Sequence, residues 1–391
     1  MIYLTAVAMV NALGSSLNEI ADNLQAGRSG LVRDDEWLLN HKTTYIGKVT
    51  HSLPTIAREF LIYNTRNNQL LLAALEQIQN QLELAKIHYG NKRIAVIMGS
   101  STTGIYEGEL AINQYSQQGK LPAHYYYQQQ EMGDLAAFLA NYLELEGPAY
   151  TISTACTSSA RAIISGKRLI EAGLVDAALV GGADTLCQLS LNGFDSLGQI
   201  SANPCMPFAK DRDGISIGEA AGVMLLTKQP AEVALLGIGE SSDAWHMSAP
   251  QPEGIGAEKS IRMALQEANL KPEQIGYINM HGTATVLNDQ MEAKAVNRVF
   301  GAETAWCSST KHLTGHTLGA AGITEAALCW IMLERELSLP QQDFSMSLLD
   351  DTLAPINLIQ QPHVLPSAKV MLSNSCAFGG NNTSILIGKV S

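Results

Sequence analysis

Cys156 is the residue best placed for nucleophilic chemistry. It lies in residues 151–160, Thr-Ile-Ser-Thr-Ala-Cys-Thr-Ser-Ser-Ala, where an apolar strand is expected to pass into a helix. A thiol at the amino terminus of a helix is close to the positive end of the helix dipole and to free N–H groups, which favour the thiolate. Such a turn would also expose the sulfur, as a nucleophile elbow exposes a serine. The alternative is a small buried core cysteine.

His281 is the first of two candidate histidines. It follows the apolar run 276–280 in the segment Met-His-Gly-Thr-Ala-Thr, and Asn288, Asp289 and Glu292 come shortly after it. Open α/β sheets bind ligands at the carboxyl ends of their strands, which is where this histidine is expected. A hydrogen-bonded structural histidine is the alternative.

Lys311 and His316 share a second segment, residues 308–322, Ser-Ser-Thr-Lys-His-Leu-Thr-Gly-His-Thr-Leu-Gly-Ala-Ala-Gly. Lys311 directly follows an apolar strand and precedes a Gly/Ala stretch suited to close packing, so we expect it to be buried. A solvated loop charge is the alternative. Thr and Gly flank His316 more tightly than His312, so His316 is the candidate and His312 the bystander.

The carboxyl-terminal segment 372–384, Leu-Ser-Asn-Ser-Cys-Ala-Phe-Gly-Gly-Asn-Asn-Thr-Ser, is expected to turn tightly between two apolar strands. A simple β-hairpin accounts for its Gly-Gly-Asn-Asn run. A backbone that approaches a ligand closely would also need glycine there.

The elements that position these residues are those of an α/β protein, because short apolar runs alternate with longer amphipathic ones. We expect strands at ten runs: 3–10, 93–98, 149–153, 177–180, 222–227, 233–239, 276–280, 305–308, 370–373 and 384–387. We expect helices at 70–87, 157–171, 257–269, 288–300 and 319–337. Near-continuous apolar strands of this kind are typical of a sheet that is buried on both faces.

Composition excludes several classes of protein. The chain has 391 residues, 46% of them hydrophobic and 16% charged, which is incompatible with an intrinsically disordered chain. Its formal net charge of −12 disfavours a general nucleic-acid binder. No run approaches 18 apolar residues, so we expect no membrane span.

The cysteines and the amino terminus indicate the cellular location. Six cysteines, without a Cys-x-x-Cys pair or metal-ligand spacing, are expected to be reduced thiols in a cytoplasmic protein without a metal. Residues 1–13 are apolar, but no basic residue precedes them, so a first buried strand is favoured over a secretory signal.

A weak internal sequence repeat predicts two similar halves, 1–235 and 236–391. In each half a strand runs through small Ser, Thr or Ala residues into a candidate residue, Cys156 or Lys311, and then into a helix rich in small residues. In each half a later apolar strand runs into a Gly-Gly pair. No linker-like stretch marks the junction, so we expect the halves to pack as one body.

Taken together and in this order, the motifs resemble the β-ketoacyl-[acyl carrier protein] synthases, and specifically the elongating enzymes that use one cysteine and two histidines. The segments Asp-Arg-Asp-Gly-Ile-Ser-Ile-Gly-Glu-Ala-Ala-Gly, from Asp211, and Val-Gly-Gly-Ala-Asp, from Val180, also match that family. The resemblance covers nearly the whole chain. It implies the thiolase-like fold, with two pseudo-twofold-related halves of buried mixed sheets and layered helices, usually in a dimer.

The resemblance also implies roles for the reactive residues. Cys156 would carry the acyl chain as a thioester, and His281 and His316 would bind the malonyl thioester carbonyl during decarboxylation. The enolate would then attack the acyl-cysteine and lengthen the chain by two carbons. The backbone N–H groups of Cys156 and Phe378 would form the oxyanion hole.

Further positions are implied to support this reaction. Lys311 and Glu292 would form an ion pair that orients the histidines. The expected substrate contacts, including those to the phosphopantetheine arm of an acyl carrier protein, are Thr283, Thr285, Gly379 and Cys376. No other cofactor is implied. The carrier protein is acidic and would dock on basic residues, for which the candidates are Arg58, Arg66, Lys210 and Arg212.

The last motif departs from the family pattern Phe-Gly-Phe-Gly-Gly-Thr-Asn, because this chain has Cys376-Ala-Phe-Gly-Gly-Asn-Asn. The loss of the first Phe predicts altered acyl specificity or gating. A specialised type II system, such as one making aryl polyenes, would pair the synthase with a chain-length factor. Fatty-acid elongation by a homodimer is the rival.

Three other functions are compatible with parts of the pattern. A thiolase shares the fold and acts on coenzyme A thioesters, but the two-histidine and lysine set argues against it. A non-catalytic chain-length factor typically lacks the nucleophile. A cysteine hydrolase would not explain Lys311 or the final Gly-Gly turn.

Overall fold

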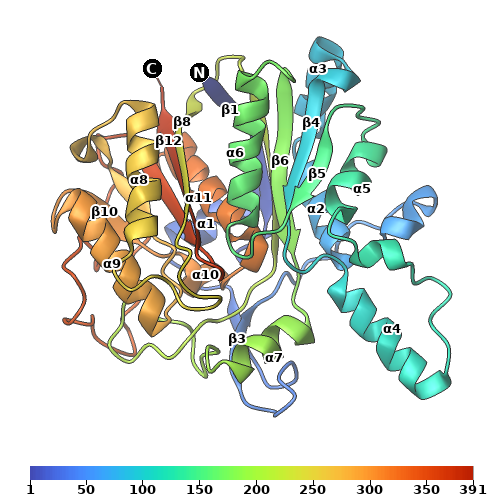
Figure 1. Ribbon diagram of the computed structural model, residues 1–391, viewed down its shortest axis with the longest axis horizontal. Helices are drawn as coiled ribbons and strands as arrows, with labels where there is room; N and C mark the ends of the chain where they lie inside the picture. Colours follow the sequence, from blue (N-terminus) through green and yellow to red (C-terminus); the bar gives the residue numbers. More distant parts are fainter. Residues whose placement is uncertain (391) are drawn as a thin grey trace.

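A ten-stranded mixed sheet runs through the computed structural model, which describes residues 1–390 (Figure 1). The strand order is β10-β9-β11-β12-β8-β1-β7-β6-β4-β5, and β2 and β3 form a separate hairpin. The strands are β1 Ile2–Val10, β2 Leu31–Asp34, β3 Thr44–Gly47, β4 Ile94–Gly99, β5 Ala149–Ile152, β6 Ala177–Asp184, β7 Ala220–Thr227, β8 Val233–Ser242, β9 Tyr277–Asn279, β10 Trp306–Ser308, β11 Val370–Cys376 and β12 Asn381–Lys389.

Helices pack on both sides of this sheet and between its two halves. They are α1 Leu17–Gln25, α2 Arg66–Glu76, α3 Gln79–Tyr89, α4 Ile105–Gln118, α5 Asp134–Tyr142, α6 Ser158–Glu171, α7 Gln188–Ser196, α8 Ile255–Ala268, α9 Val286–Phe300, α10 Lys311–Thr314 and α11 Ala321–Arg335. Within residues 1–390 no helix is both long and apolar enough to cross a membrane.

The strand order repeats on the two sides of the central β1–β8 pair. β1, β7, β6, β4 and β5 follow on one side, and β8, β12, β11, β9 and β10 on the other. On each side the first two pairings are antiparallel and the next two are parallel. The predicted boundary after residue 235 lies inside β8, which begins at Val233, and the division into two domains stays a prediction.

Three apolar clusters define the layers. The largest contains α6, α11 and residues from strands of both halves, so these two helices lie between the halves. A second cluster packs α2, α3 and α5 on the outer face of the first half, and a third packs α8 and α9 on the outer face of the second. Figure 1 shows this succession, with α8 and α9 at one side, α6 in the middle and α5 at the other.

The ten predicted strands are the ten strands of the large sheet, with boundaries that differ by a few residues. The helix predicted at 70–87 is wrong as a single helix. The structure has α2 and α3 there, because Ile78 leaves the helical conformation with a φ of −119°. The Gln77 side chain, just before the break, donates to the carbonyls of Met9 and Ser15. These two bonds hold the end of α2 next to β1 and the segment that follows β1.

The close crossing of α6 and α11 gives a stability prediction. A Cβ atom on Gly322 would lie 2.6 Å from the Cβ and 2.7 Å from the backbone nitrogen of Ala160. We expect Gly322→Ala to lower the free energy of unfolding by about 1–3 kcal/mol, because overpacking forces the helices apart. Urea midpoints would measure the change. Gly193→Ala is the matched control, since Gly193 is exposed on α7 with no atom within 4 Å of its Cβ position. Equal midpoints for the two variants would contradict the prediction.

Candidate active site

Cys156 lies in a strained turn between β5 and α6. Ala155, the residue before it, has a φ of +51°, which is unfavourable for a side chain with a Cβ. The hydroxyl of Ser158 accepts the N–H of Thr154 at 2.9 Å and also donates to the Ala155 carbonyl, which holds the turn. The predicted elbow is therefore present, and its thiol projects into the site rather than into the core.

His281 is held through its backbone. It comes two residues after β9, and Glu292 of α9 accepts the N–H groups of His281 and Gly282 at 2.7 and 2.8 Å. Gly282 has a φ of +34°, and a Cβ there would lie 2.6 Å from the Cβ of Ser309, so only glycine fits. Burial raises the pKa of Glu292 to about 7, whereas the two N–H groups lower it.

Lys311 is buried, and the groups that pair with its charge differ from the predicted one. Its ammonium donates to the carboxylate of Glu325 on α11 and to the carbonyl of His281, and lies 3.4 Å from His281 Nδ1. The predicted ion pair with Glu292 is therefore wrong, because that carboxylate is occupied by backbone N–H groups. Glu325 was missed, although it is the only charged residue between Lys311 and Glu334 other than the histidines and lies in an otherwise apolar stretch.

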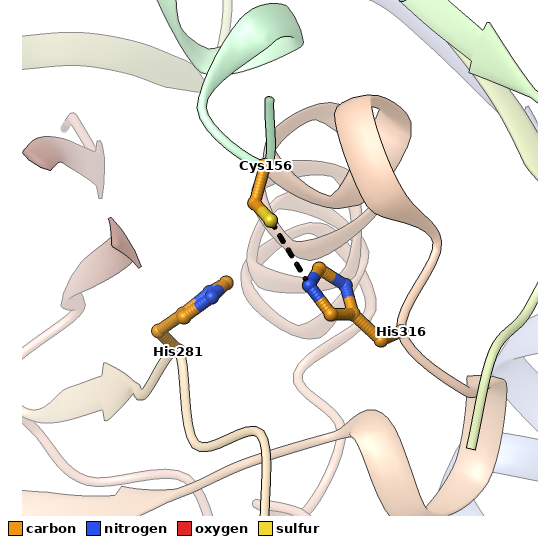
Figure 2. A group of neighbouring side chains, drawn as sticks. All are labelled: Cys156, His281 and His316. Atoms are coloured by element: carbon orange, nitrogen blue, oxygen red, sulfur yellow. Dashed lines mark hydrogen bonds between the residues drawn. The ribbon is translucent and has the colours of Figure 1, made fainter. Parts of the chain in front are cut away.

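His316 completes the site from the loop after α10. Its Nε2 lies 3.2 Å from the Cys156 sulfur, and the centroids of the two histidine rings are 5.3 Å apart with the rings nearly perpendicular. Figure 2 shows the side chains of Cys156, His281 and His316 pointing toward one another. The N–H of Leu318 donates to His316 Nδ1 at 3.3 Å. His312 turns away and bonds to the Ser309 carbonyl at 2.9 Å.

The contacts on the two Nδ1 atoms determine where the imidazole hydrogens lie. Burial and the charge of Lys311 lower the pKa of both His281 and His316 well below its ordinary value, so both rings are neutral. A neutral ring that accepts a hydrogen bond at Nδ1 carries its hydrogen on Nε2. Both histidines are thus Nε2–H donors, suited to a developing oxyanion.

The thiol is not acidic at rest. Burial raises the pKa of Cys156 to about 12, against the opposing effects of the Lys311 charge and of the Phe378 and Cys156 N–H groups. The sequence-based expectation that the helix terminus favours the thiolate is therefore outweighed by desolvation.

Two cavities meet at Cys156. The first, of about 860 Å³ with its open mouth included, is lined by the predicted residues Cys156, His281, Thr283, Thr285, His316, Cys376 and Phe378. The second, of about 610 Å³, is lined by Cys156, Phe378 and Phe194 together with residues of the β4–α4 segment and of α7.

The hydroxyls of two predicted substrate contacts, Thr283 and Thr285, form a hydrogen bond of 2.9 Å with each other. Gly379 lies at the exposed turn and donates to the Met247 carbonyl, outside both linings.

Asp184 is a further residue that the sequence reasoning missed. Its buried carboxylate accepts N–H groups of Ser101, Thr102 and Gly319, and the hydroxyl of Ser100 at 2.7 Å. It therefore ties the second cavity's wall to the segment that follows His316. The motif Val-Gly-Gly-Ala-Asp contained it, but a carboxylate at the end of a strand gave no indication of these donors.

Two of the predicted docking residues are engaged elsewhere. Arg66 forms a pair with the buried carboxylate of Glu219, and Arg212 is only 6% exposed and pairs with Asp350 at 2.6 Å. Lys210 and Arg58 are exposed. Arg212 is therefore not available to a partner's acidic surface, and the charge of Arg66 is already paired.

The three central side chains also offer a metal-like donor set. One ligand atom from each of Cys156, His281 and His316 lies within 4.8 Å of the others. A sulfur and two imidazole nitrogens are the donors that Zn²⁺ prefers. The adjacent Lys311 ammonium opposes any cation at this place.

Comparison with known families decides which chemistry this arrangement belongs to. The beta-ketoacyl synthase N-terminal domain matches residues 1–231, and the beta-ketoacyl synthase C-terminal domain matches residues 233–345. The chain belongs to the β-ketoacyl synthase family. The family predicted from the sequence motifs is thus confirmed, and this synthase is an acyltransferase-type condensing enzyme.

Similar proteins agree with this assignment. The 3-oxoacyl-[acyl-carrier-protein] synthase 2 of Vibrio cholerae is 29% identical over 100% of this chain and 99% of its own. A chain of the complex of the ketosynthase ApeO with its chain length factor ApeC from Xenorhabdus doucetiae is 53% identical with a TM-score of 0.96, and the match covers 100% of this chain and 98% of that chain. The ishigamide ketosynthase/chain length factor is 26% identical with a TM-score of 0.89, over 100% and 99% of the two chains. These structures confirm the predicted α/β fold.

The raised thiol pKa predicts how the synthase reacts with an alkylating agent. Only the thiolate attacks iodoacetamide, so alkylation of Cys156 should accelerate about tenfold per pH unit from pH 6 to pH 9 without reaching a plateau. Intact-mass kinetics would follow the reaction, with Cys156→Ala correcting for the five other cysteines. A plateau between pH 6 and pH 7 would instead show a resting thiolate.

Proposed function

We propose that this synthase elongates an acyl chain by decarboxylative Claisen condensation of an acyl-cysteine with malonyl-[acyl carrier protein]. One observation carries the proposal: the Cys156 sulfur lies 3.2 Å from a neutral histidine that donates through Nε2–H, and a second such histidine shares the cavity. That arrangement joins a nucleophile to two donors without a general base, which suits carbanion formation by loss of CO₂.

The first half-reaction loads the enzyme. The Cys156 sulfur attacks the carbonyl of an acyl thioester, and a C–S bond forms as the bond to the pantetheine sulfur breaks. The cysteine proton ends on the departing sulfur. The N–H groups of Cys156 and Phe378 stabilise the tetrahedral oxyanion, for which one donor typically contributes roughly 3–4 kcal/mol. The second cavity, on the other side of Phe378, would hold the acyl chain.

The second half-reaction extends the chain. The malonyl thioester carbonyl accepts hydrogen bonds from His281 and His316, and the C–C bond to the carboxylate breaks to release CO₂ and leave an enolate. The enolate carbon attacks the acyl-cysteine carbonyl, and the C–S bond breaks. The freed sulfur takes up a proton from water, and the product is a β-ketoacyl thioester longer by two carbons.

The substrate arm fits the first cavity. Thr283 and Thr285 line its wall between the mouth and the histidines, where their hydroxyls could meet the amides of a phosphopantetheine arm. The carrier-bound arm would then be the only cofactor-like group, and no resident cofactor is required. Cys376 lines the same cavity and would contact the substrate near the nucleophile.

The partners we infer are an acyl carrier protein and a second synthase-like subunit. Helix α4 projects from the body in Figure 1 and exposes Leu110, Ile112 and Tyr115, each at least 52% accessible. Large exposed apolar groups of this kind are typical of an interface. The 53% identity to a chain of a solved ketosynthase/chain length factor complex favours a heterodimer over a homodimer. An aryl polyene or another specialised type II pathway stays the prediction.

A cytoplasmic location is also inferred. The six cysteines are all free and buried in the structure, which agrees with a reducing compartment. The presence of Cys156 and both histidines in one site argues against a non-catalytic chain-length factor, and the two Nε2–H donors argue against a hydrolase.

Separating the two half-reactions tests the proposal. Intact mass after mixing with an acyl-[acyl carrier protein] should show one acyl group on the wild type and on His281→Ala, and none on Cys156→Ala. Condensation with malonyl-[acyl carrier protein] should fall at least 10²-fold in His281→Ala, because one oxyanion donor is lost. His312→Asn, which keeps a donor for the Ser309 carbonyl, is the matched histidine control and should condense normally. An unacylated wild type in the presence of its partner subunit would refute the function.

Cys376 predicts altered acyl specificity. It packs against Ala257, Met291 and Ala295 and lines the first cavity, so the ring of Cys376→Phe would narrow the space through which an acyl thioester must pass to reach Cys156. We expect long or bulky acyl groups to load about tenfold more slowly relative to short ones, since pocket shape discriminates by such factors. Acylation rates for a series of chain lengths would measure this ratio. Cys376→Ser is the size-matched control, and identical profiles for all three proteins would contradict the prediction.

A further inference from the structure

The donor set at the centre of the site poses a selectivity problem. A sulfur and two imidazoles within 4.8 Å of one another, facing a cavity open to solvent, are a group of side chains that could hold a metal ion, and their donor types suit zinc. Capture of a metal there would occupy the Cys156 sulfur and block acylation. Geometry alone therefore does not keep this site free for its substrate.

The groups behind the imidazoles have the opposite polarity to those of a metal site. A histidine that binds a metal usually donates its other N–H to a carboxylate, a carbonyl or water. Here the other nitrogen faces donors: the Lys311 ammonium lies 3.4 Å from His281 Nδ1, and the Leu318 N–H donates to His316 Nδ1 at 3.3 Å. Both rings consequently present N–H, not a lone pair, at Nε2.

We propose that Lys311, together with the Leu318 N–H, excludes divalent metal ions from the Cys156–His281–His316 set by fixing both imidazoles as Nε2–H tautomers. To bind a metal at Nε2, each ring would have to move its hydrogen to Nδ1. In His281 that hydrogen would point at an ammonium group, and in His316 at a backbone N–H. Binding at His281 Nδ1 instead would place the metal directly against the ammonium.

The charge of Lys311 adds to this effect. Its ammonium is 1% exposed, so its repulsion of a second cation is screened only weakly by water. Glu325 neutralises the lysine but offers no ligand to the cavity, because it is buried and lines neither of the two cavities. The inference concerns metal binding and is independent of the proposed condensation.

Cobalt binding tests the proposal, because a tetrahedral Co²⁺ thiolate site has an intense charge-transfer absorption. The variant Lys311→Met/Glu325→Gln replaces the buried pair by neutral groups of similar shape, and Lys311→Arg keeps the charge and a donor. We expect the double variant to show the band and to bind Co²⁺ and Zn²⁺ about 10–100-fold more tightly than the wild type, as changes behind a ligand typically do. Lys311→Arg should remain like the wild type, and adding Cys156→Ala should abolish the band.

A measurement on the wild type keeps the test decisive if the double variant does not fold. Zn²⁺ equimolar with the protein should leave the alkylation rate of Cys156 unchanged at neutral pH. Protection of Cys156 by equimolar Zn²⁺ would overturn the proposal. So would a folded double variant, verified by circular dichroism, that binds Co²⁺ no better than the wild type.

Discussion

A single buried ammonium group governs the geometry of the active site. The charge of Lys311 cannot remain unpaired away from water, and removing one partner of such a pair typically costs about 3–5 kcal/mol. Its three partner groups come from two parts of the chain: the carboxylate of Glu325 on α11, and the carbonyl and the ring of His281 after β9. The helix between the halves, the loop after β9 and the imidazole orientation are therefore fixed together by one charge.

The repeated strand order explains how residues from both halves reach one place. Cys156 follows β5, Lys311 follows β10 and His281 follows β9, each at the carboxyl end of a parallel strand. β5 and β10 are the two edge strands of the sheet and occupy equivalent positions in the two halves. Because α6 and α11 pack against each other between the halves, the loops that precede them meet, and the nucleophile of one half faces the donors of the other.

The sequence was sufficient for what depends on local pattern and insufficient for what depends on how elements cross. Apolar runs predicted the ten strands of the large sheet but not β2 and β3, and motif chemistry predicted the residues that converge at the site. The sequence did not predict which carboxylate pairs with Lys311. Glu292 lies on α9 and Glu325 on α11, and only the packing of these two helices determines which of them contacts the ammonium. Likewise Arg66 and Arg212 were predicted to be free surface charges, yet they pair with Glu219 and Asp350, which are distant in sequence, and Arg212 is buried. Desolvation of Cys156, which outweighs the helix terminus, is also a property of the assembled fold alone.

The separation of the reactive groups along the chain has a consequence for the making of the protein. Cys156 and His316 are 160 residues apart, which corresponds to roughly 8–32 s of synthesis at typical rates. Throughout that interval the ribosome holds a chain whose thiol has no histidine beside it and whose inner helix α6 has no α11 to cover it. The nascent first half is thus chemically incomplete and exposes an apolar surface. The reactive centre can assemble only near the end of translation. Premature termination therefore yields a chain that needs chaperone protection and has no competent site.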